Sequence, residues 1–323
     1  MVLLIPLIGY LKRNFPATKI DLLCRAYAAP IARLCEHIDQ VHVLEEIGDE
    51  ETFFRQGLWA SVVFAHPVQR LAMAAWRAGV PNRVGTINRL YNWFSCNRRV
   101  YFRRVHSRLH EAQLNFLLMR PLGLDVMPSL AQLVDCFGLH ANPDKTTTVF
   151  KEPGRFHVIL HPGSNGNGRE WPISHYLKLA QLLREQSNIT FLITGSGGEG
   201  ARLQQHAPEL LNQPNVRNLC GTLDLDQLAT LIAQSDGLIA SGTGPLHMAA
   251  ALGRPTLGLF PALKAIDAIR WGALGRHARN LSATRTCDAC TDRNNCRCMQ
   301  EISPEQVQAV VIQWCTTPCT FSN

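Results

Sequence analysis

The chain has 323 residues, of which 46% are hydrophobic and 18% charged, a balance typical of a folded protein and not of a disordered one. No apolar run reaches the roughly 20 residues of a membrane-spanning helix, and the apolar start lacks the basic flank and cleavage site of a signal peptide. The formal net charge is +7 and arises mainly from one interval, described below.

The N-terminal half alternates short helical and extended segments. A helix with a basic end is predicted over Val2–Asn14 and is ended by Phe15-Pro16. Further helices are predicted at Pro30–His37, Val68–Ala78 and His110–Met119, and strands at Lys19–Cys24, Val41–Leu44, Trp59–Ala65 and Arg83–Thr86. The segment Phe53–Leu58 is compatible with either structure.

Basic residues gather in an interval free of acids. Between Glu51 and Glu111 there is no Asp or Glu, while ten arginines occur, interleaved with aromatic residues at 91–102. Because arginine binds phosphate and carboxylate groups in a bidentate manner, this interval favours a polyanionic partner, such as nucleic acid, an anionic membrane or a phosphorylated glycolipid. The alternative is a solvated basic face with no specific partner.

The polar segment Ala141–Thr148 marks a domain boundary, so we predict domains at 1–150 and 151–302. A last helix, capped by Ser303 and Gln306, is predicted within 303–323 and is expected to pack back on the first domain. In the second half, strands are predicted at Phe156–His161, Ile189–Thr194, Val216–Leu219 and Gly237–Ser241, and helices at Ile173–Arg184, Leu225–Gln234 and Leu246–Leu252. This alternation predicts an α/β fold with a parallel sheet.

Two glycine-rich turns follow strands in the second domain. The loop 162–168 follows the first strand, and Gly242-Thr243-Gly244 precedes a helix that begins at Pro245. Free backbone N–H groups and a helix N-terminus bind phosphate, and Arg169 and His247 lie nearby. The alternative is that these glycines serve only packing. Two Rossmann-like domains are predicted to face a cleft, with ligand at the carboxyl ends of the strands.

Three segments carry a resemblance to a known family. They are HEAQLNFLLMRPLGL at 110–124, HPGSNGNGREWPISHYLKLAQLL from His161, and GTGPLHMAAALGRPTLGLFP ending at Pro261. The chain resembles glycosyltransferase family 9, the ADP-heptose:lipopolysaccharide heptosyltransferases, which have the two-domain GT-B architecture. The likeness covers nearly the whole chain.

The resemblance implies a donor site in the second domain. Ser164 and Asn165 fall near the phosphate-binding loop positions, and Arg169 falls on the cationic residue before Trp-Pro. Glu199 falls on the ribose-binding acid and Leu223 near the adenine. The glycine turn and its histidine fall on Gly242, Thr243, Gly244 and His247. His161, at a strand end, is a further candidate.

Two departures from the family pattern bear on this expectation. The turn begins with Gly242 where the family has an Asp that contacts the donor sugar, which leaves the sugar open. Family members also begin with a strand and a Gly-Asp whose Asp is the catalytic base, and that stretch would precede Met1. Either the start has been placed too late or the chain is a truncated, catalytically impaired member.

The implied activity is inverting transfer of heptose from ADP-heptose to the lipopolysaccharide inner core, without a metal. Arg98, Arg99, Arg103 and Arg104 are candidates for binding the anionic acceptor. The protein is expected in the cytoplasm, with peripheral contact to the inner membrane. Rival hypotheses are another nucleotide-activated hexose as donor, a non-catalytic glycolipid- or nucleotide-binding protein, and a nucleic-acid binder.

Four of the eleven cysteines, Cys287, Cys290, Cys296 and Cys298, have spacings that suggest metal ligands. The second pair is closer than zinc knuckles usually allow. Reduced thiols packing a loop are therefore the first expectation for this segment, and a structural zinc or a disulfide are the alternatives.

Overall fold

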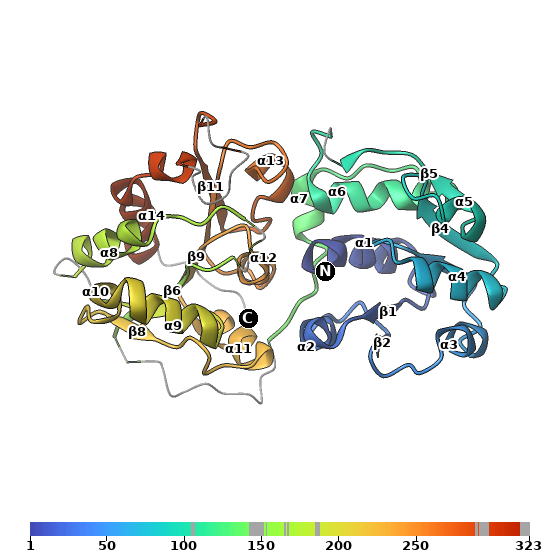
Figure 1. Cartoon of the computed structure of the whole chain (residues 1–323), viewed down its shortest axis with the longest axis horizontal. Coiled ribbons are helices and arrows are strands. Elements are labelled where there is room, and N and C mark those ends of the chain that lie inside the picture. Colours follow the sequence, from blue (N-terminus) through green and yellow to red (C-terminus); the bar gives the residue numbers. More distant parts are fainter. Residues whose placement is uncertain are drawn as a thin grey trace. The chain divides into compact units, whose positions relative to one another are not determined.

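A computed structural model describes residues 1–104, 107–141, 152, 154–164, 166, 168–184, 188–287, 290 and 297–316. The chain divides into two compact units, one essentially Leu3–Gly138 and the other essentially Leu139–Asn323 (Figure 1). The second unit therefore begins before the predicted boundary at 150. Of the polar segment that suggested that boundary, residues 142–148 lie outside the described residues.

The first unit is built from short elements, and its strands form two separate parallel sheets. Its strands are β1 (Asp21–Cys24), β2 (Gln40–Val43), β3 (Ser61–Val63), β4 (Asn82–Thr86) and β5 (Arg98–Val100). The first sheet is β1-β2 and the second is β3-β4-β5. The indole N–H of Trp59, just before β3, donates to the Asp21 carboxylate at the start of β1 at 3.1 Å. Among the described residues, no backbone pairing joins the two sheets.

The helices of the first unit are shorter than the sequence suggested. The α-helices are α1 (Ile5–Asn14), α2 (Ala29–Arg33), α3 (Glu50–Gln56), α4 (Gln69–Arg77), α5 (Asn92–Ser95), α6 (Glu111–Phe116) and α7 (Leu130–Val134). The ambiguous segment after Asp49 is helix α3, because the Asp49 carboxylate caps it at Thr52 N–H, 2.8 Å away. The arginine-rich interval contains α5 and β5, which the sequence pattern did not indicate.

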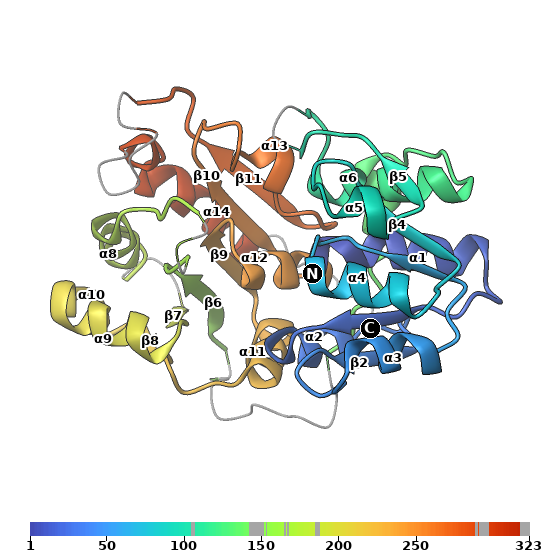
Figure 2. The same ribbon diagram turned by 45° about the vertical axis from the view of Figure 1, so that its right-hand side comes forward.

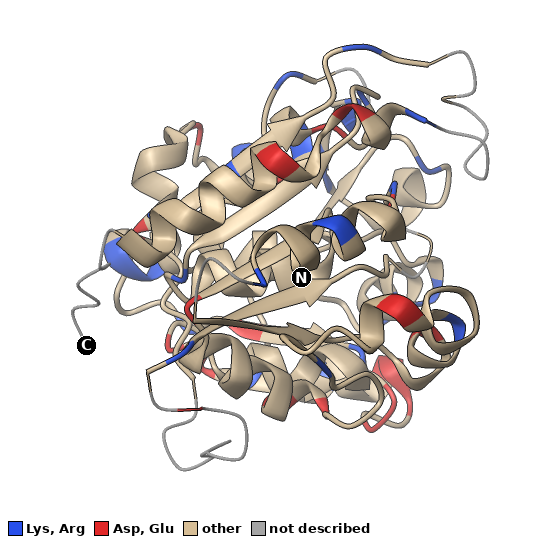
Figure 3. Cartoon of the chain, turned by 90° about the vertical axis from the view of Figure 1, so that its left-hand side faces the viewer, with Lys and Arg blue, Asp and Glu red and all other residues tan. Residues whose placement is uncertain are grey.

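The second unit contains one six-stranded parallel sheet. The strands are β6 (Phe156–His161), β7 (Ile189–Ile193), β8 (Val216–Asn218), β9 (Gly237–Ser241), β10 (Thr256–Phe260) and β11 (Ala278–Ser282). Their order is β11-β10-β9-β6-β7-β8, so the strand order reverses between β6 and β9. β10 and β11 were not predicted. The four central strands β6, β7, β9 and β10 contain no Lys, Arg, Asp or Glu. In Figure 3 the coloured Lys, Arg, Asp and Glu residues lie mainly on helices and connecting segments, and the strand arrows are largely tan.

Helices complete the second unit on the faces of this sheet (Figure 2). They are α8 (Ile173–Leu182), α9 (Gly197–His206), α10 (Pro208–Leu211), α11 (Leu225–Gln234), α12 (Gly244–Ala251), α13 (Ala268–Trp271) and α14 (Pro304–Thr316). Alternate strand residues such as Leu160 and Phe191 share a buried cluster with α8, α9, α10 and α14, whereas α12 packs on β9 and β10 and also contacts α11.

The last helix differs from expectation in its partner. Ser303 and Gln306 form the predicted capping box, with Ser303 N donating to Gln306 Oε1 at 2.8 Å. However, α14 packs on α8 and places Val307 and Val311 in the core of the second unit. Its apolar face is thus buried within that unit, and the expected packing on the first domain is corrected.

The close approach of α1 to Cys136, two residues after α7, provides a stability test. A Cβ added at Gly9 would lie 2.0 Å from the backbone oxygen of Cys136, which cannot move without shifting the chain. Gly9→Ala should therefore lower the free energy of unfolding by about 1–3 kcal/mol and lower the Tm measured by circular dichroism. Gly198→Ala is the matched control, because nothing lies within 4 Å of its added Cβ. Equal Tm values for the two variants would contradict this packing.

Candidate functional site

The two glycine-rich turns meet at the carboxyl edge of the sheet in the second unit. His161 at the end of β6 pairs in register with Ala240 of β9, and a glycine turn follows each strand. A Cβ on Gly168 would lie 3.5 Å from the carbonyl oxygen of Gly242. The turns therefore touch at the point where the strand order reverses, which is where parallel α/β sheets bind ligands.

The N-terminus of α12 presents polar groups at this point. Its N-cap residue Thr243 makes no side-chain capping bond. The hydroxyls of Ser241 and Thr243 are buried, at 0% and 8% exposure, and have no hydrogen-bond partner in the described part of the chain. His247 is buried in the first turn of the helix. A buried hydroxyl without a partner costs about 1–3 kcal/mol, so an oxygen-rich anion bound here would satisfy both the hydroxyls and the helix end.

Ser164 is hydrogen-bonded to the carboxylate of Glu170, a residue that the sequence analysis did not assign to the site. Its backbone N–H and its hydroxyl both donate to Glu170 Oε1, at 2.8 and 2.9 Å. The sequence predicted a loop of free hydrogen-bond donors. Instead, the Glu170 carboxylate already accepts hydrogen bonds from both donors of Ser164. The only signal in the sequence was an acid six residues after the serine. Asn165, the other predicted loop residue, lies outside the described residues.

Arg169 is held by a distant part of the chain. Helix α8 begins at Ile173, as predicted, so Arg169 lies in the segment before this helix. Its Nη2 donates to the carbonyl oxygen of Cys290 at 2.7 Å, and its Nε is buried without a partner among the described residues. One edge of the guanidinium is thus fixed, and Nε has a donor left for a ligand.

Glu199 belongs to the first turn of α9, and its side chain reaches the first glycine loop. Its Oε2 accepts hydrogen bonds from the Ser196 backbone N–H at 2.7 Å and from the Ser196 hydroxyl at 2.9 Å, which forms a capping box. A Cβ on Gly163 would lie 1.9 Å from Glu199 Oε1. The carboxylate therefore reaches the loop after β6, and glycine at 163 is what makes room for it.

A cavity of about 200 Å³ opens beside these residues. It lies at the carboxyl ends of β6, β7 and β8 and at the start of α11. Its lining residues are His161, Thr194, Gly195, Ser196, Leu219, Leu223, Asp224, Leu225 and Leu228. The predicted adenine neighbour Leu223 and the candidate His161 are both in this wall. Four leucines with a polar rim make a pocket suited to a flat heterocycle.

Burial favours the neutral forms of His161 and Cys220. Burial lowers the pKa of His161 from its ordinary value, against the opposing charges of Glu199 and Glu170. The imidazole Nδ1 lies 2.9 Å from the Thr194 hydroxyl. Burial, with a smaller effect of Glu199, raises the pKa of the Cys220 thiol to about 11. At neutral pH neither group carries charge, so Arg169 is the principal cation near the two turns.

The predicted acceptor arginines lie in the first unit and differ in their surroundings. Arg98, Arg99 and Arg103 are exposed. The Arg99 guanidinium lies over the Trp93 ring, 5.3 Å from its centroid. Arg104 is partly buried and forms an ion pair with Glu111. Three of the four therefore remain available to an anion at the surface.

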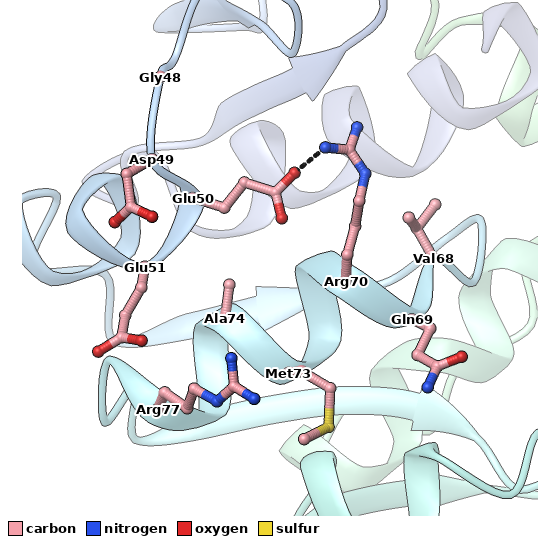
Figure 4. A pocket seen from close by; sticks show the side chains of 10 residues that line it. All are labelled: Gly48, Asp49, Glu50, Glu51, Val68, Gln69, Arg70, Met73, Ala74 and Arg77. Carbon is pink, nitrogen blue, oxygen red and sulfur yellow. Dashed lines mark hydrogen bonds and ion pairs between the residues drawn. The ribbon is translucent and has the colours of Figure 1, made fainter.

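A larger pocket lies between α3 and α4 of the first unit (Figure 4). Its volume is about 780 Å³, and it is lined by Gly48, Asp49, Glu50, Glu51, Val68, Gln69, Arg70, Met73, Ala74 and Arg77. Arg70 pairs with Glu50 across it. Three acids face two arginines here, so the pocket is a poor match for a polyanionic acceptor, and it contains none of the predicted site residues.

The fold and the position of the donor-type site define an α/β protein of the GT-B class. The solved structure of Escherichia coli ADP-heptose lipopolysaccharide heptosyltransferase II is similar in fold, with a TM-score of 0.73, 19% identity, and coverage of 97% of this chain and 94% of that one. Two Rossmann-like units in one chain agree with this class.

Sequence comparison defines the family. The model of glycosyltransferase family 9 (heptosyltransferase) matches residues 92–299. A Haemophilus influenzae protein with a provisional glycosyltransferase name is 25% identical over 282 residues, which cover 82% of this chain and 80% of that protein. Lipopolysaccharide heptosyltransferase 2 of Escherichia coli is 34% identical over 101 residues, 31% of this chain and 29% of its own length. The chain belongs to glycosyltransferase family 9 and is a glycosyltransferase.

The lowered pKa of His161 gives a pH test. The His161 side chain takes up a proton near pH 6.5 in the unfolded chain and only at lower pH in the folded chain. The free energy of unfolding therefore decreases as pH falls below about 6.5, with a slope from this residue of at most about 1.4 kcal/mol per pH unit. His161→Asn removes this titration, so in denaturant unfolding the variant should lose less stability than the wild type between about pH 7.5 and about pH 5.5. Parallel curves for both proteins would contradict a depressed pKa.

Proposed function

We propose that the second unit binds ADP-heptose and that the chain transfers the heptose, with inversion, to the inner core of lipopolysaccharide. The observation that carries the proposal is the contact between the two glycine turns beneath the N-terminus of α12. The choice of donor is supported by the similarity in fold to an ADP-heptose lipopolysaccharide heptosyltransferase. The turn residue Gly242 keeps a second donor, another nucleotide-activated hexose, as the alternative.

In this proposal each part of the donor has a place. The base occupies the leucine-lined cavity beside His161. Glu199, which is hydrogen-bonded to the lining residue Ser196, accepts hydrogen bonds from the ribose. The diphosphate lies over the two turns, where the hydroxyls of Ser241 and Thr243 and the N-terminus of α12 meet it. Arg169 supplies the positive charge through its remaining donor.

The reaction is a single displacement at the anomeric carbon. An acceptor hydroxyl oxygen bonds to that carbon while the bond from the carbon to the phosphate oxygen breaks, and ADP leaves. The hydroxyl proton passes to a base for which we assign no residue. The charge that develops on the leaving phosphate is stabilised by Arg169 and by the start of α12, so we propose no metal ion at the phosphates.

Glu170 opposes the diphosphate in this scheme. Its carboxylate accepts the two Ser164 hydrogen bonds that a phosphate would otherwise receive. A bound diphosphate must therefore displace this carboxylate or bind beside it against charge repulsion. The residue would weaken nucleotide binding and so favour release of ADP.

Calorimetric titration of ADP into four proteins tests the donor site. Arg169→Ala should weaken ADP binding about tenfold to a hundredfold, because a charged hydrogen bond is lost. Thr243→Val should weaken it about fivefold without lowering the Tm, because the hydroxyl has no partner in the described part of the free protein. Glu170→Gln should strengthen it about fivefold.

The control for this titration is Thr230→Val in α11. The Thr230 hydroxyl donates a hydrogen bond to the Asp226 carbonyl oxygen within the same helix, at 3.0 Å. It should leave ADP affinity unchanged. Failure of ADP to bind the wild-type chain, or equal affinity in all the variants, would overturn the donor-site assignment. Titration of UDP on the same samples distinguishes the alternative donor.

We also propose that the first unit contacts an anionic membrane surface. Within its described residues, no helix is long and apolar enough to cross a membrane. Instead, Leu90, Trp93, Phe94 and Tyr101 are exposed by 83, 50, 75 and 60%, among the exposed Arg89, Arg98, Arg99 and Arg103. Exposed aromatic residues with arginines suit the interface of an anionic bilayer, where lipopolysaccharide precursors are anchored.

Sedimentation with vesicles tests this surface. The wild-type chain should bind phosphatidylglycerol vesicles and not phosphatidylcholine vesicles, with binding that falls as salt is raised. The double variant Leu90→Ala/Phe94→Ala should bind at least about fivefold more weakly, because about two large apolar contacts are lost. Tyr27→Ala, exposed by 73% outside this surface, is the control. Unchanged binding by the double variant would exclude these residues from the contact.

A further inference from the structure

We infer that Cys287, Cys290 and Cys298 form a zinc site that positions Arg169. The three Sγ atoms lie within 4.8 Å of one another. Cys290 and Cys298 are buried, and no disulfide joins the three residues. Cys296, the fourth cysteine of the sequence cluster, lies outside the described residues. The chain thus gathers three soft ligands at one point beside the donor-type site.

Backbone amides point at all three sulfur atoms. The N–H of Cys287 lies 3.3 Å from Cys290 Sγ and 3.2 Å from Cys298 Sγ. The N–H of Arg297 donates to Cys287 Sγ at 3.3 Å. Hydrogen bonds from amides stabilise the negative form of a thiol, which is the form that binds metal. A loop that only packed neutral thiols would not require a donor at each sulfur.

The distances fit a thiolate-bound zinc with one adjustment. In a tetrahedron with Zn–S bonds of about 2.3 Å, sulfur atoms are about 3.8 Å apart. Cys287 and Cys290 have this separation, 3.8 Å. The Sγ atoms of Cys290 and Cys298 are 2.9 Å apart, so they would have to move apart by about 0.9 Å to bind the ion. Three thiolates select zinc over magnesium or calcium, and they leave one position of the tetrahedron for a further ligand.

The site is linked to the donor machinery through one backbone group. The carbonyl oxygen of Cys290 accepts the hydrogen bond from Arg169 Nη2 at 2.7 Å. Cys290 also packs in a small buried cluster with Ala283 and Cys298, against Ala262 and Leu263 after β10. A metal that fixes Cys290 therefore fixes the arginine. This link, unlike the zinc site itself, rests on the proposed donor function.

Metal analysis of the full chain, with any affinity tag removed, tests the site. We expect about one zinc per wild-type chain by inductively coupled plasma mass spectrometry. Cys298→Ser should lose the zinc, and Cys315→Ser, a cysteine of α14 outside the cluster, should keep it. Replacement of zinc by Co²⁺ in the wild type should give thiolate-to-metal charge-transfer absorption, which does not depend on whether a variant folds. ADP affinity should fall about fivefold when zinc is removed by a chelator.

The outcomes separate the two proposals. A wild-type chain that binds ADP but holds no zinc and gives no Co²⁺–thiolate band overturns the zinc site, as does a disulfide found by mass spectrometry between two of the three cysteines. Zinc in the wild type without ADP binding supports the site and overturns the donor function. Removal of zinc with no change in ADP affinity overturns the link to Arg169.

Discussion

The parallel pairing of β6 with β9 is the constraint on which the site depends. These two strands are far apart in the sequence, yet their pairing places His161 beside Ala240 and brings the following turns into contact. Strand order reverses at this pair, so the two crossover connections leave in opposite directions and the carboxyl edge stays open. Every group that we assign to the donor is carried by a segment that begins at this edge or packs against it.

Much of this arrangement could be predicted from sequence, because it depends on local rules. The apolar run Gly237–Ser241, the glycine turn and Pro245 specify a strand, a turn and a helix start. What could not be predicted were contacts between distant residues. The bond from Arg169 to Cys290 spans 121 positions, and no local pattern encodes it. β10 was missed because a five-residue buried run between two prolines, Pro255 and Pro261, has no periodicity of its own.

Charge was the least reliable guide. The acid-free interval favoured a polyanionic partner. Folding nevertheless brings acids from outside the interval to some of its arginines, as with Glu50 at Arg70 and Glu111 at Arg104. Glu170 shows the converse. Nothing in the sequence distinguishes this acid from others, yet in the fold its carboxylate accepts hydrogen bonds from Ser164 in a loop that was expected to bind anions. Net charge along a segment therefore describes solubility and long-range attraction better than it describes a binding site.

The unequal burial of the two sets of strands has a consequence for local opening. Every residue of β7, β9 and β10 is buried, whereas every residue of β1 and β3 is partly exposed, and these two strands lie in separate small sheets. Amide hydrogens with little apolar cover and few sheet neighbours exchange with solvent through low-energy fluctuations. We therefore expect the amide hydrogens of β1 and β3 to exchange faster than those of β7, β9 and β10, the buried strands of the sheet that carries the nucleotide-type site.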